Sequence, residues 1–247
     1  MTATFTDLWA EIAPIGRDPR TGGYLRYAFT EPDLVLRDWF RNQADRRDMP
    51  VTDDGNGNLF AWRGEPWAAG TVLTGSHFDS VPHGGGYDGP LGIVSAFLAV
   101  DRLPPGTPVA VAAFAEEEGG RFGVPCLGSR LLTGAIDPDR AAALCDADGV
   151  SFGEALGARP AGAAPHLLGR LSAVVELHIE QGRALDVPVG VASAIWPHGR
   201  WRFDFAGDGD HAGTTRMADR HDPMLTFAHT VLAADEQARL AGAHATM

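Results

Sequence analysis

No lysine occurs in the 247-residue sequence, so all 20 basic residues are arginines. This absence excludes enzymes that form a Schiff base through lysine, and P-loop proteins, whose phosphate-binding loop needs a lysine. Cysteine is also scarce: only Cys126 and Cys145 are present, and no CxxC pair exists. A zinc ribbon and a thioredoxin-type redox motif are therefore excluded as well.

Long apolar segments and an excess of positive charge are missing too. No apolar run approaches the roughly 18 residues of a membrane helix, and no basic region followed by an apolar run opens the chain. The 32 acidic residues give a formal net charge of −12, which disfavours nucleic acid and anionic membranes as partners. Hydrophobic residues make up 45% of the chain, enough for a packed core. We therefore expect a soluble, cytoplasmic protein.

Hydrophobic periodicity predicts an α/β fold. Strands that alternate with helices imply βαβ units, and hence an open, mostly parallel sheet flanked by helices. Ligands of such a sheet gather outside the carboxyl ends of its strands. The expected strands are residues 59–62, 71–74, 108–115 and 172–177, and the expected helices are residues 91–103 and a segment that contains residues 34–40.

Histidine and carboxylate side chains follow three of these strands. His77 comes after the second predicted strand and lies on the same glycine-rich loop as Asp88. Glu117 and Glu118 follow the third strand, and His178 follows the fourth. Adjacent carboxylates repel each other unless a cation is present, and successive side chains of an extended segment point in different directions. One carboxylate can therefore bind a metal while its neighbour faces the substrate, which favours a hydrolytic metal centre.

Other interpretations exist for the same segments. A loop histidine is commonly structural, which is the simplest alternative for His77. Residues 84–89 match the GxGxxG pattern of dinucleotide-binding folds, but they lie too far after the strand, and Asp88 would face the pyrophosphate. Residues 53–58 resemble a calcium loop but lack its closing glutamate. The metal centre remains the favoured interpretation.

Five segments together resemble the hydantoinase/carbamoylase family of amidases. They occur in the family's order and span nearly the whole chain. The resemblance implies a zinc-exopeptidase-like α/β fold and a hydrolase that acts on a non-peptide C–N bond of a small ureido compound. The relatives in the wider clan of dinuclear metallopeptidases usually carry an acidic residue in place of His178. The five segments are residues 75–81 (GSHFDSV), 86–92 (GYDGPLG), 117–122 (EEGGRF), 178–182 (HIEQG) and 211–217 (HAGTTRM).

The resemblance implies two divalent metal ions as cofactors. Asp88 corresponds to the carboxylate that bridges both ions, and His77 and His178 correspond to its partners on one of them. Glu118 corresponds to the carboxylate on the second ion. Either Zn²⁺ or Mn²⁺ suits a mixture of histidine and carboxylate ligands.

Three further residues correspond to catalytic or substrate-binding positions. Glu117 resembles the general base, Gln181 a substrate-binding residue, and His211 the lid histidine that approaches the substrate, often from the partner subunit of a dimer. In the implied mechanism Glu117 takes a proton from water and delivers it to the leaving nitrogen, while metal and His211 stabilise the oxyanion. Arg216 stands where the family usually has proline, which leaves the conformation of that loop open.

Allantoate amidohydrolase, an enzyme of purine catabolism, is the predicted activity within the family. Residues 22–27 (GGYLRY) and 56–62 (NGNLFAW) resemble bacterial members with that function. The products would be ureidoglycine or ureidoglycolate, ammonia and carbon dioxide. N-carbamoyl-L-amino-acid hydrolase and β-ureidopropionase are the alternative activities.

Two domains of unequal completeness are predicted. Residues 1–199 are expected to form the metal-binding catalytic domain, and residues 200–247 the beginning of an α+β lid and dimerisation domain. A strand over residues 200–205 and a helix over residues 222–240 are expected in the second domain. In the family the lid continues, and the chain then returns to the catalytic domain to supply a last metal-binding histidine.

The sequence is therefore interpreted as a shortened chain. The first metal keeps three protein ligands, whereas the second keeps only Asp88 and Glu118, so we expect the second site to be weak. The homodimer implied by the family would lack part of its dimerisation domain. A catalytically inactive remnant that binds at most one metal tightly is the alternative of another class.

Overall fold

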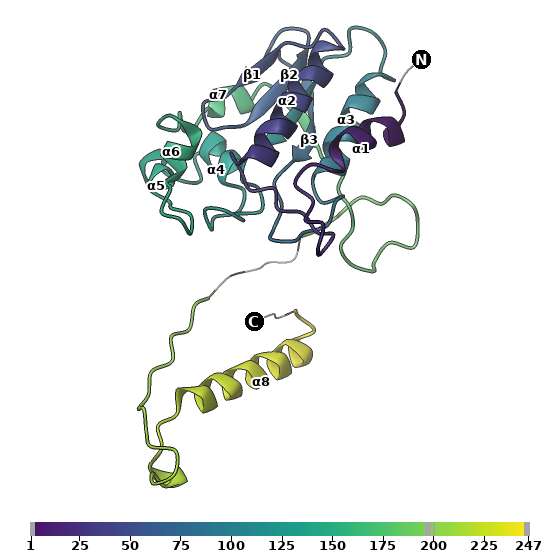
Figure 1. Ribbon diagram of the computed structural model, residues 1–247. Coiled ribbons are helices and arrows are strands. Elements are labelled where there is room, and N and C mark those ends of the chain that lie inside the picture. The colour runs from purple at the N-terminus through teal and green to yellow at the C-terminus, as the bar shows by residue number, and fades with distance from the viewer. Residues whose placement is uncertain (1–2, 196–198, 200, 245–247) are drawn as a thin grey trace. The chain divides into compact units, whose positions relative to one another are not determined.

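The chain folds into two compact units, Met1–Asp186 and Val187–Met247 (Figure 1). The computed structural model describes residues 3–195, 199 and 201–244. The predicted domain boundary after residue 199 lies later in the chain than this division, and the functional domains stay a prediction. The strands of the first unit are β1 (Val51–Asp53), β2 (Leu59–Arg63), β3 (Thr71–His77), β4 (Val109–Phe114) and β5 (Leu171–Val175).

Most of the described helices are short, and three have more than ten residues, two in the first unit and one in the second. Those of the first unit are α1 (Phe5–Ile12), α2 (Glu31–Asp45), α3 (Pro90–Val100), α4 (Leu127–Thr133), α5 (Pro138–Ala142), α6 (Phe152–Leu156) and α7 (Pro165–Leu168). The second unit contains the 3-10 turn η1 (Met217–Asp219) and α8 (Pro223–Ala241).

The five strands form one mixed sheet in the order β1-β2-β4-β3-β5. β3 is parallel to both β4 and β5, whereas β2 is antiparallel to β4 and to β1. The predicted α/β fold is therefore confirmed, and each of the four predicted strands overlaps an observed one. Because β3, β4 and β5 run the same way, the loops that follow them emerge at one edge of the sheet.

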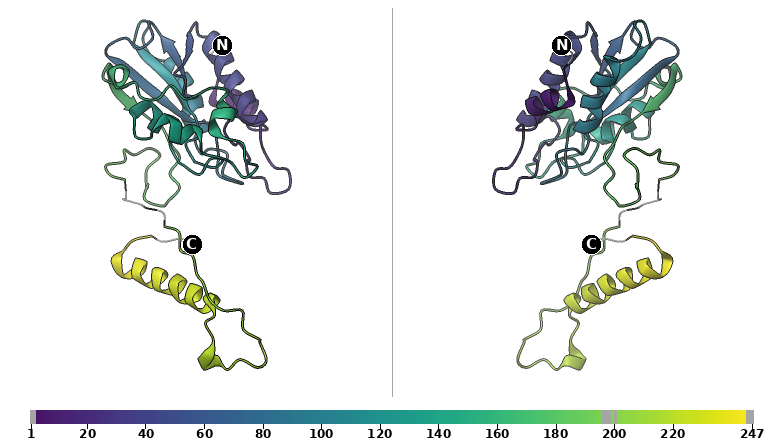
Figure 2. Two further views of the ribbon diagram at one scale, coloured as in Figure 1. Left: turned by 90° about the vertical axis from the view of Figure 1, so that its left-hand side faces the viewer. Right: turned by 90° about the vertical axis from the view of Figure 1, so that its right-hand side faces the viewer.

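Helices cover both faces of the sheet (Figure 2). Helices α1, α2 and α3 pack on one face against alternate strand residues such as Leu59 and Val111. Leu132 of α4 and Leu168 of α7 pack on the other face, where Phe60 lies. The alternation of buried side chains between two faces is the ordinary consequence of the strand's two-residue period.

A close backbone approach joins β3 to β4. Gly75 has a φ of +144°, and a Cβ atom at this position would lie 2.0 Å from the carbonyl oxygen of Ala112 in β4. Only glycine fits there without moving one strand away from the other. The residue sits two positions before His77, so the same approach sets where the carboxyl end of β3 lies.

The turn of residues 53–58, before β2, forms hydrogen bonds that fix the end of β4, and it does not have the features of a cation site. The Asp54 carboxylate accepts hydrogen bonds from the backbone N–H and the side-chain amide of both Asn56 and Asn58. Its oxygens are thus already satisfied by four donors, which removes the calcium alternative. Asn58 also accepts the N–H of Ala115, directly after β4, and donates to the carbonyl of Gly128.

Strand β5 is the least covered part of the sheet. It lies at one edge and pairs only with β3 among the described residues. Val174 and Val175 are 62% and 54% exposed, whereas the strand residues of β4 are buried or nearly so. Parallel strands are ordinarily covered on both faces, so this strand is held mainly by its single ladder.

The second unit differs from the prediction in one respect. Residues 201–205 are described but form no strand, and Arg200 lies outside the described residues. Alternating apolar residues form a strand only beside a partner that accepts their backbone hydrogen bonds, and no such partner lies next to them in the part of the chain that is described. Phe205 instead packs edge-on against Phe227 of α8.

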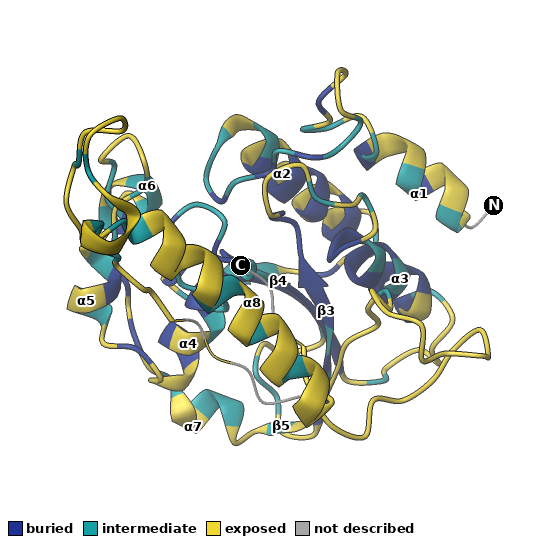
Figure 3. Cartoon of the chain, turned by 90° about the horizontal axis from the view of Figure 1, so that it is seen from below, coloured by how far each residue is buried: buried dark blue, intermediate teal, exposed yellow. Residues whose placement is uncertain are grey.

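Helix α8 agrees with the predicted helix over residues 222–240. Asp222 caps it by accepting the N–H of Met224, and Pro223 occupies its first position. None of its described residues is buried, as the exposed colour along its length in Figure 3 shows. Among the described residues, no helix is long and apolar enough to cross a membrane.

Candidate metal centre

Three of the predicted ligands meet at the carboxyl edge of the sheet. His77 ends β3, Asp88 lies on the loop before α3, and His178 follows β5. The Asp88 Oδ1 atom lies 3.1 Å from His178 Nε2 and 3.9 Å from His77 Nε2. One ligand atom from each residue falls within 4.8 Å of the other two. A single divalent ion can contact all three at that spacing.

The chemistry of His77 fits a metal ligand. Its Nδ1 atom donates to the carbonyl oxygen of Asp79 at 2.9 Å, so the neutral ring carries its lone pair on Nε2. That Nε2 atom is buried and has no hydrogen-bond partner in the described structure. A buried nitrogen acceptor without a partner is costly unless something binds it. A cation between His77, Asp88 and His178 would satisfy this atom.

Asp79 is a site residue that the sequence interpretation missed. It is 2% exposed, and its two carboxylate oxygens accept the backbone N–H groups of Glu117 and Glu118 at 3.1 and 3.0 Å. Burial raises the pKa of Asp79, although His77 and the two N–H groups oppose the shift. Asp79 therefore connects the end of β3 to the loop after β4. Its position two residues after His77 was the available signal.

The carboxylate pair after β4 lies beside the three clustered residues. Glu117 Oε2 is 3.6 Å from His77 Nε2, and the Glu117 side chain is 37% exposed. Burial raises the pKa of Glu118 to about 7, and the neighbouring Asp88 carboxylate adds to the shift. Burial alone would lower the pKa of His77, but the carboxylates of Asp79 and Glu117 reverse the direction and raise it. The site thus concentrates negative charge that a cation would offset.

Known proteins resemble this chain over most of its length. The chain is 36% identical over 252 aligned residues to the N-carbamoyl-L-amino acid amidohydrolase of Geobacillus stearothermophilus, a match that covers 94% of this chain and 60% of that protein. It is 35% identical to the allantoate amidohydrolase of Escherichia coli K12, with 94% and 59% covered. A solved hydantoinase/carbamoylase family amidase from Burkholderia ambifaria superimposes with a TM-score of 0.67 at 32% identity, covering 94% of this chain and 60% of that one.

The relatives and structural neighbours of this chain are hydantoinase/carbamoylase family amidases. The family resemblance predicted from the five segments is thereby confirmed. No protein-family model matches the chain. The chain spans between 47% and 60% of the length of the curated relatives compared with it.

Glu116 differs in role from the two glutamates that follow it. It is fully buried and has a φ of +50°, and its Oε1 atom accepts the N–H groups of Arg121 and Phe122 at 2.9 and 2.6 Å. Burial raises the pKa of Glu116 to about 7. Its contacts hold the turn within residues 117–122, so Glu116 shapes the loop, and its carboxylate forms no hydrogen bond or ion pair with His77 or His178 in the described structure.

Gln181, the predicted substrate-binding residue, contacts the cluster directly. Its Nε2 atom donates to Asp88 Oδ2 at 2.6 Å, opposite the oxygen that faces the histidines. Glu180 beside it accepts the N–H groups of Ala184 and Leu185 and so shapes the following turn. Gln181 therefore orients Asp88, and its contact with substrate stays a prediction.

His211, the predicted lid histidine, belongs to the second unit and is exposed. Arg216, which replaces the family's usual proline, has a φ of −64° and a ψ of 148°. Proline adopts the same conformation, so the substitution leaves the backbone path intact. The Arg216 side chain forms an ion pair with Asp219 at 2.6 Å, and its side chain is 82% exposed.

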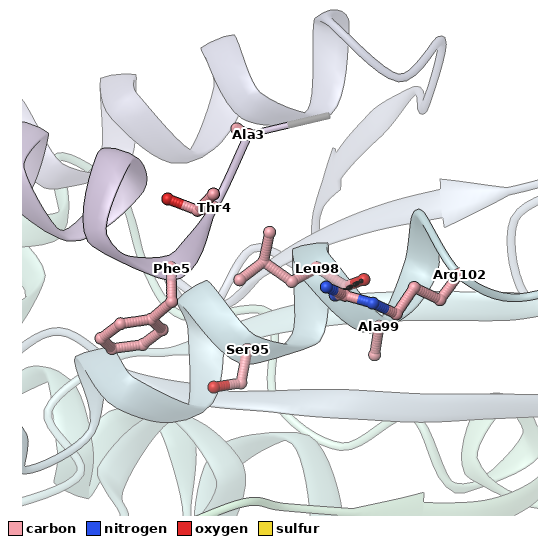
Figure 4. A pocket seen from close by; sticks show the side chains of 7 residues that line it. All are labelled: Ala3, Thr4, Phe5, Ser95, Leu98, Ala99 and Arg102. Carbon is pink, nitrogen blue, oxygen red and sulfur yellow. Dashed lines mark hydrogen bonds between the residues drawn. The ribbon is translucent and has the colours of Figure 1, made fainter. Parts of the chain in front are cut away.

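A groove between α1 and α3 is another place where a ligand could bind (Figure 4). Its volume is about 520 Å³, and its rim includes Phe5, Ser95, Leu98 and Arg102. The groove is open, and its lining holds one charged side chain and no histidine or carboxylate. It lacks groups for acid–base or metal chemistry, so the edge of the sheet is the better candidate.

Proposed function

We propose that this chain is a metal-dependent amidohydrolase that cleaves a linear ureido C–N bond. The observation that carries the proposal is the meeting of His77, Asp88 and His178 at the carboxyl edge of the sheet. The names of the amidohydrolase relatives support the reaction class. Because the chain spans only about 60% of those relatives, the whole protein's activity is part of the proposal and not a finding.

The geometry of the three clustered residues supports the proposed first metal site. His77, Asp88 and His178 would hold one divalent ion, Zn²⁺ or Mn²⁺, and Glu118 with Asp88 is proposed to contribute to a weaker second site. When bound, such an ion supplies Lewis-acid chemistry for amide hydrolysis. The raised pKa of Glu118 reflects its burial beside Asp88, and binding of a cation is expected to favour the ionised form of both carboxylates.

The protein's own residues supply proton transfer and positioning. Glu117 is proposed as the general base, which takes a proton from the attacking water and returns it to the leaving nitrogen. Its backbone is fixed by Asp79, and its Oε1 atom accepts a hydrogen bond from the thiol of Cys126 at 3.3 Å. His211 is proposed to donate to the oxyanion, and Gln181 to keep Asp88 oriented while facing the substrate.

Allantoate is the proposed substrate, and N-carbamoyl-L-amino acids and β-ureidopropionate are the alternatives. Relatives named for allantoate and for N-carbamoyl-L-amino acids both match at about 35% identity, so they support the ureido class and leave the choice within it to experiment. A catalytically inactive remnant that binds one metal is the alternative of another class. A homodimer and a cytoplasmic location remain predictions from the sequence.

Release of ammonia tests the proposal. The purified chain, loaded with Mn²⁺ or Zn²⁺, is incubated with allantoate, N-carbamoyl-L-amino acids or β-ureidopropionate. We expect turnover on at least one of them, fastest on allantoate. His178→Ala should lower turnover by at least about 100-fold, because it removes a proposed ligand. His166→Ala, which changes an exposed histidine on α7, should leave turnover unchanged.

The pattern of results separates the alternatives. No ammonia from any of the three substrates, with metal bound, would support the inactive remnant. Equal activity of the His178→Ala variant and the unaltered chain would reject the proposed metal centre, whatever the substrate.

A further inference from the structure

The loop that carries His211 is organised by one arginine. Arg220 reaches back along the chain, and its Nη2 atom donates to the carbonyl oxygens of His211, Ala212 and Thr215 at 3.1, 2.9 and 3.1 Å. A guanidinium nitrogen has two N–H groups, so one of them serves two acceptors. Hydrogen bonds from a charged donor are about twice as strong as neutral ones. Arg220 therefore holds three carbonyl groups together that would otherwise repel each other.

The same loop constrains the imidazole of His211. The N–H of Gly213 donates to His211 Nδ1 at 3.1 Å, and the N–H of Thr215 donates to the carbonyl of His211 at 3.2 Å. An imidazole nitrogen that accepts a hydrogen bond carries no proton, so the neutral ring must hold its proton on Nε2. The His211 side chain is exposed, which leaves that Nε2–H group free to meet a ligand.

The neighbouring arginine has no such role. Arg216 contacts Asp219, its side chain is 82% exposed, and it forms no hydrogen bond with the carbonyls of residues 211–215 in the described structure. Arg220 also carries an Nε atom that is buried and without a partner among the described residues. A buried donor without a partner costs free energy. The three hydrogen bonds from Nη2 to backbone carbonyls offset this cost and hold the Arg220 side chain in place.

We propose that Arg220 is a positioning residue that holds residues 211–215 in the turn which fixes His211 as an Nε2–H donor. The relevance to catalysis rests on the proposed function, in which His211 donates a hydrogen bond to the oxyanion. When the proton of the neutral His211 ring is already on Nε2, no free energy is spent on changing the tautomer as negative charge develops on the oxyanion. The turn itself requires no substrate or metal.

Nitrogen NMR of the imidazole tests the proposal. In ¹⁵N-labelled protein at pH about 8, where an unperturbed imidazole is neutral, we expect the His211 spectrum of a ring protonated on Nε2. The His211→Gln variant identifies its signals among those of the nine histidines. In Arg220→Ala we expect a mixture of tautomers, and in Arg220→Lys, which keeps the charge, an intermediate shift towards the original spectrum.

Amide hydrogen exchange gives an independent readout. In Arg220→Ala we expect the amides of Gly213 and Thr215 to exchange about tenfold faster, because their acceptors on His211 are no longer held. Arg216→Ala is the matched control and should change neither readout. Unchanged spectra and exchange in Arg220→Ala, or a ring protonated on Nδ1 in the unaltered chain, would overturn the inference.

Turnover separates this inference from the proposed function. If both readouts change as expected and kcat on the ureido substrate falls about tenfold with KM nearly unchanged, both hold. If the readouts change but turnover of Arg220→Ala equals that of the unaltered chain, Arg220 still positions the loop, and the proposed role of His211 in hydrolysis is wrong.

Discussion

Asp79 shows how one buried residue can serve several others. Its carbonyl oxygen accepts the Nδ1–H of His77, and its carboxylate accepts the N–H groups of Glu117 and Glu118. The tautomer of His77, a proposed metal ligand, is thus set by the backbone of Asp79, and the path of the loop with the proposed base is set by its side chain. A histidine of this kind depends on the partner behind it as much as on its own position.

Asp33 on α2 gives a prediction about pH. Burial raises the pKa of Asp33 to about 6, against the effect of Arg37 and of the N–H of Phe29, which donates to its carboxylate at 2.8 Å. The folded state thus prefers the protonated form. Stability from this group is fully present below the unfolded pKa of about 4 and is lost as pH rises through about 6.

Asp33→Asn should remove this dependence. The amide stays neutral and can still accept the N–H of Phe29. Between pH 4 and 7.5 the variant should gain on the order of 2 kcal/mol in its free energy of unfolding relative to the unaltered chain, as measured by urea titration. Asp38→Asn, which changes a carboxylate of α2 that is 77% exposed, is the control. Parallel pH profiles for Asp33→Asn and the unaltered chain would contradict the assignment.

At the scale of elements, the close contact of β3 and β4 is the feature most sensitive to substitution. Gly75→Ala would place a methyl group 2.0 Å from the carbonyl oxygen of Ala112, in a backbone conformation with φ of +144°. One strand must then move, so the free energy of unfolding should fall by at least about 3 kcal/mol in urea titration.

Gly106 provides the matched comparison for Gly75. It has a φ of +81° but nothing within 4 Å of the position that a Cβ atom would take. Gly106→Ala should therefore cost only the backbone strain, about 1–2 kcal/mol. Equal losses in the two variants would mean that the strand contact contributes nothing beyond that strain.

The elements that were predicted correctly from the sequence include those with the most pronounced apolar patterns. β4 and α3 are nearly continuous apolar runs, and such runs have few alternatives to burial. β1 has three residues of mixed exposure, so it leaves no pattern to find. Residues 201–205 alternate as a strand does, yet pairing depends on a neighbour, which periodicity within one segment does not report.

Part of the candidate site could also be predicted from the sequence. His77, Glu118 and His178 were expected at one edge because parallel strands bring their carboxyl ends together there. That Asp88 joins the two histidines was expected only from the family resemblance. The contacts of Asp79 and Gln181, by contrast, are decided by side-chain direction within loops. The hydrogen bond from Gln181 to Asp88 at 2.6 Å depends on the turn that Glu180 shapes, and no spacing rule predicts such a turn.

At the scale of the whole molecule, the number of bound metal ions is the most informative quantity. Calorimetric titration with Mn²⁺ or Zn²⁺ should find one tight site per chain, because among the described residues only the set His77, Asp88 and His178 offers three ligands. A second ion, held by Asp88 and Glu118, should bind far more weakly. His178→Ala should abolish the tight site and His166→Ala should preserve it. Two equally tight sites would be incompatible with this arrangement.

The exposure of β5 has a consequence for how long the site persists. This strand is held by a single ladder, and His178 follows it directly. Elements of this kind open locally more often than buried strands do. A ligand that binds only the closed form lowers the population of the open form in proportion to its concentration. The time for which β5 stays paired with β3 then depends on the concentration of the proposed metal ion as much as on the sequence. The resistance of the chain to proteases and to strand exchange should depend on that concentration in the same way.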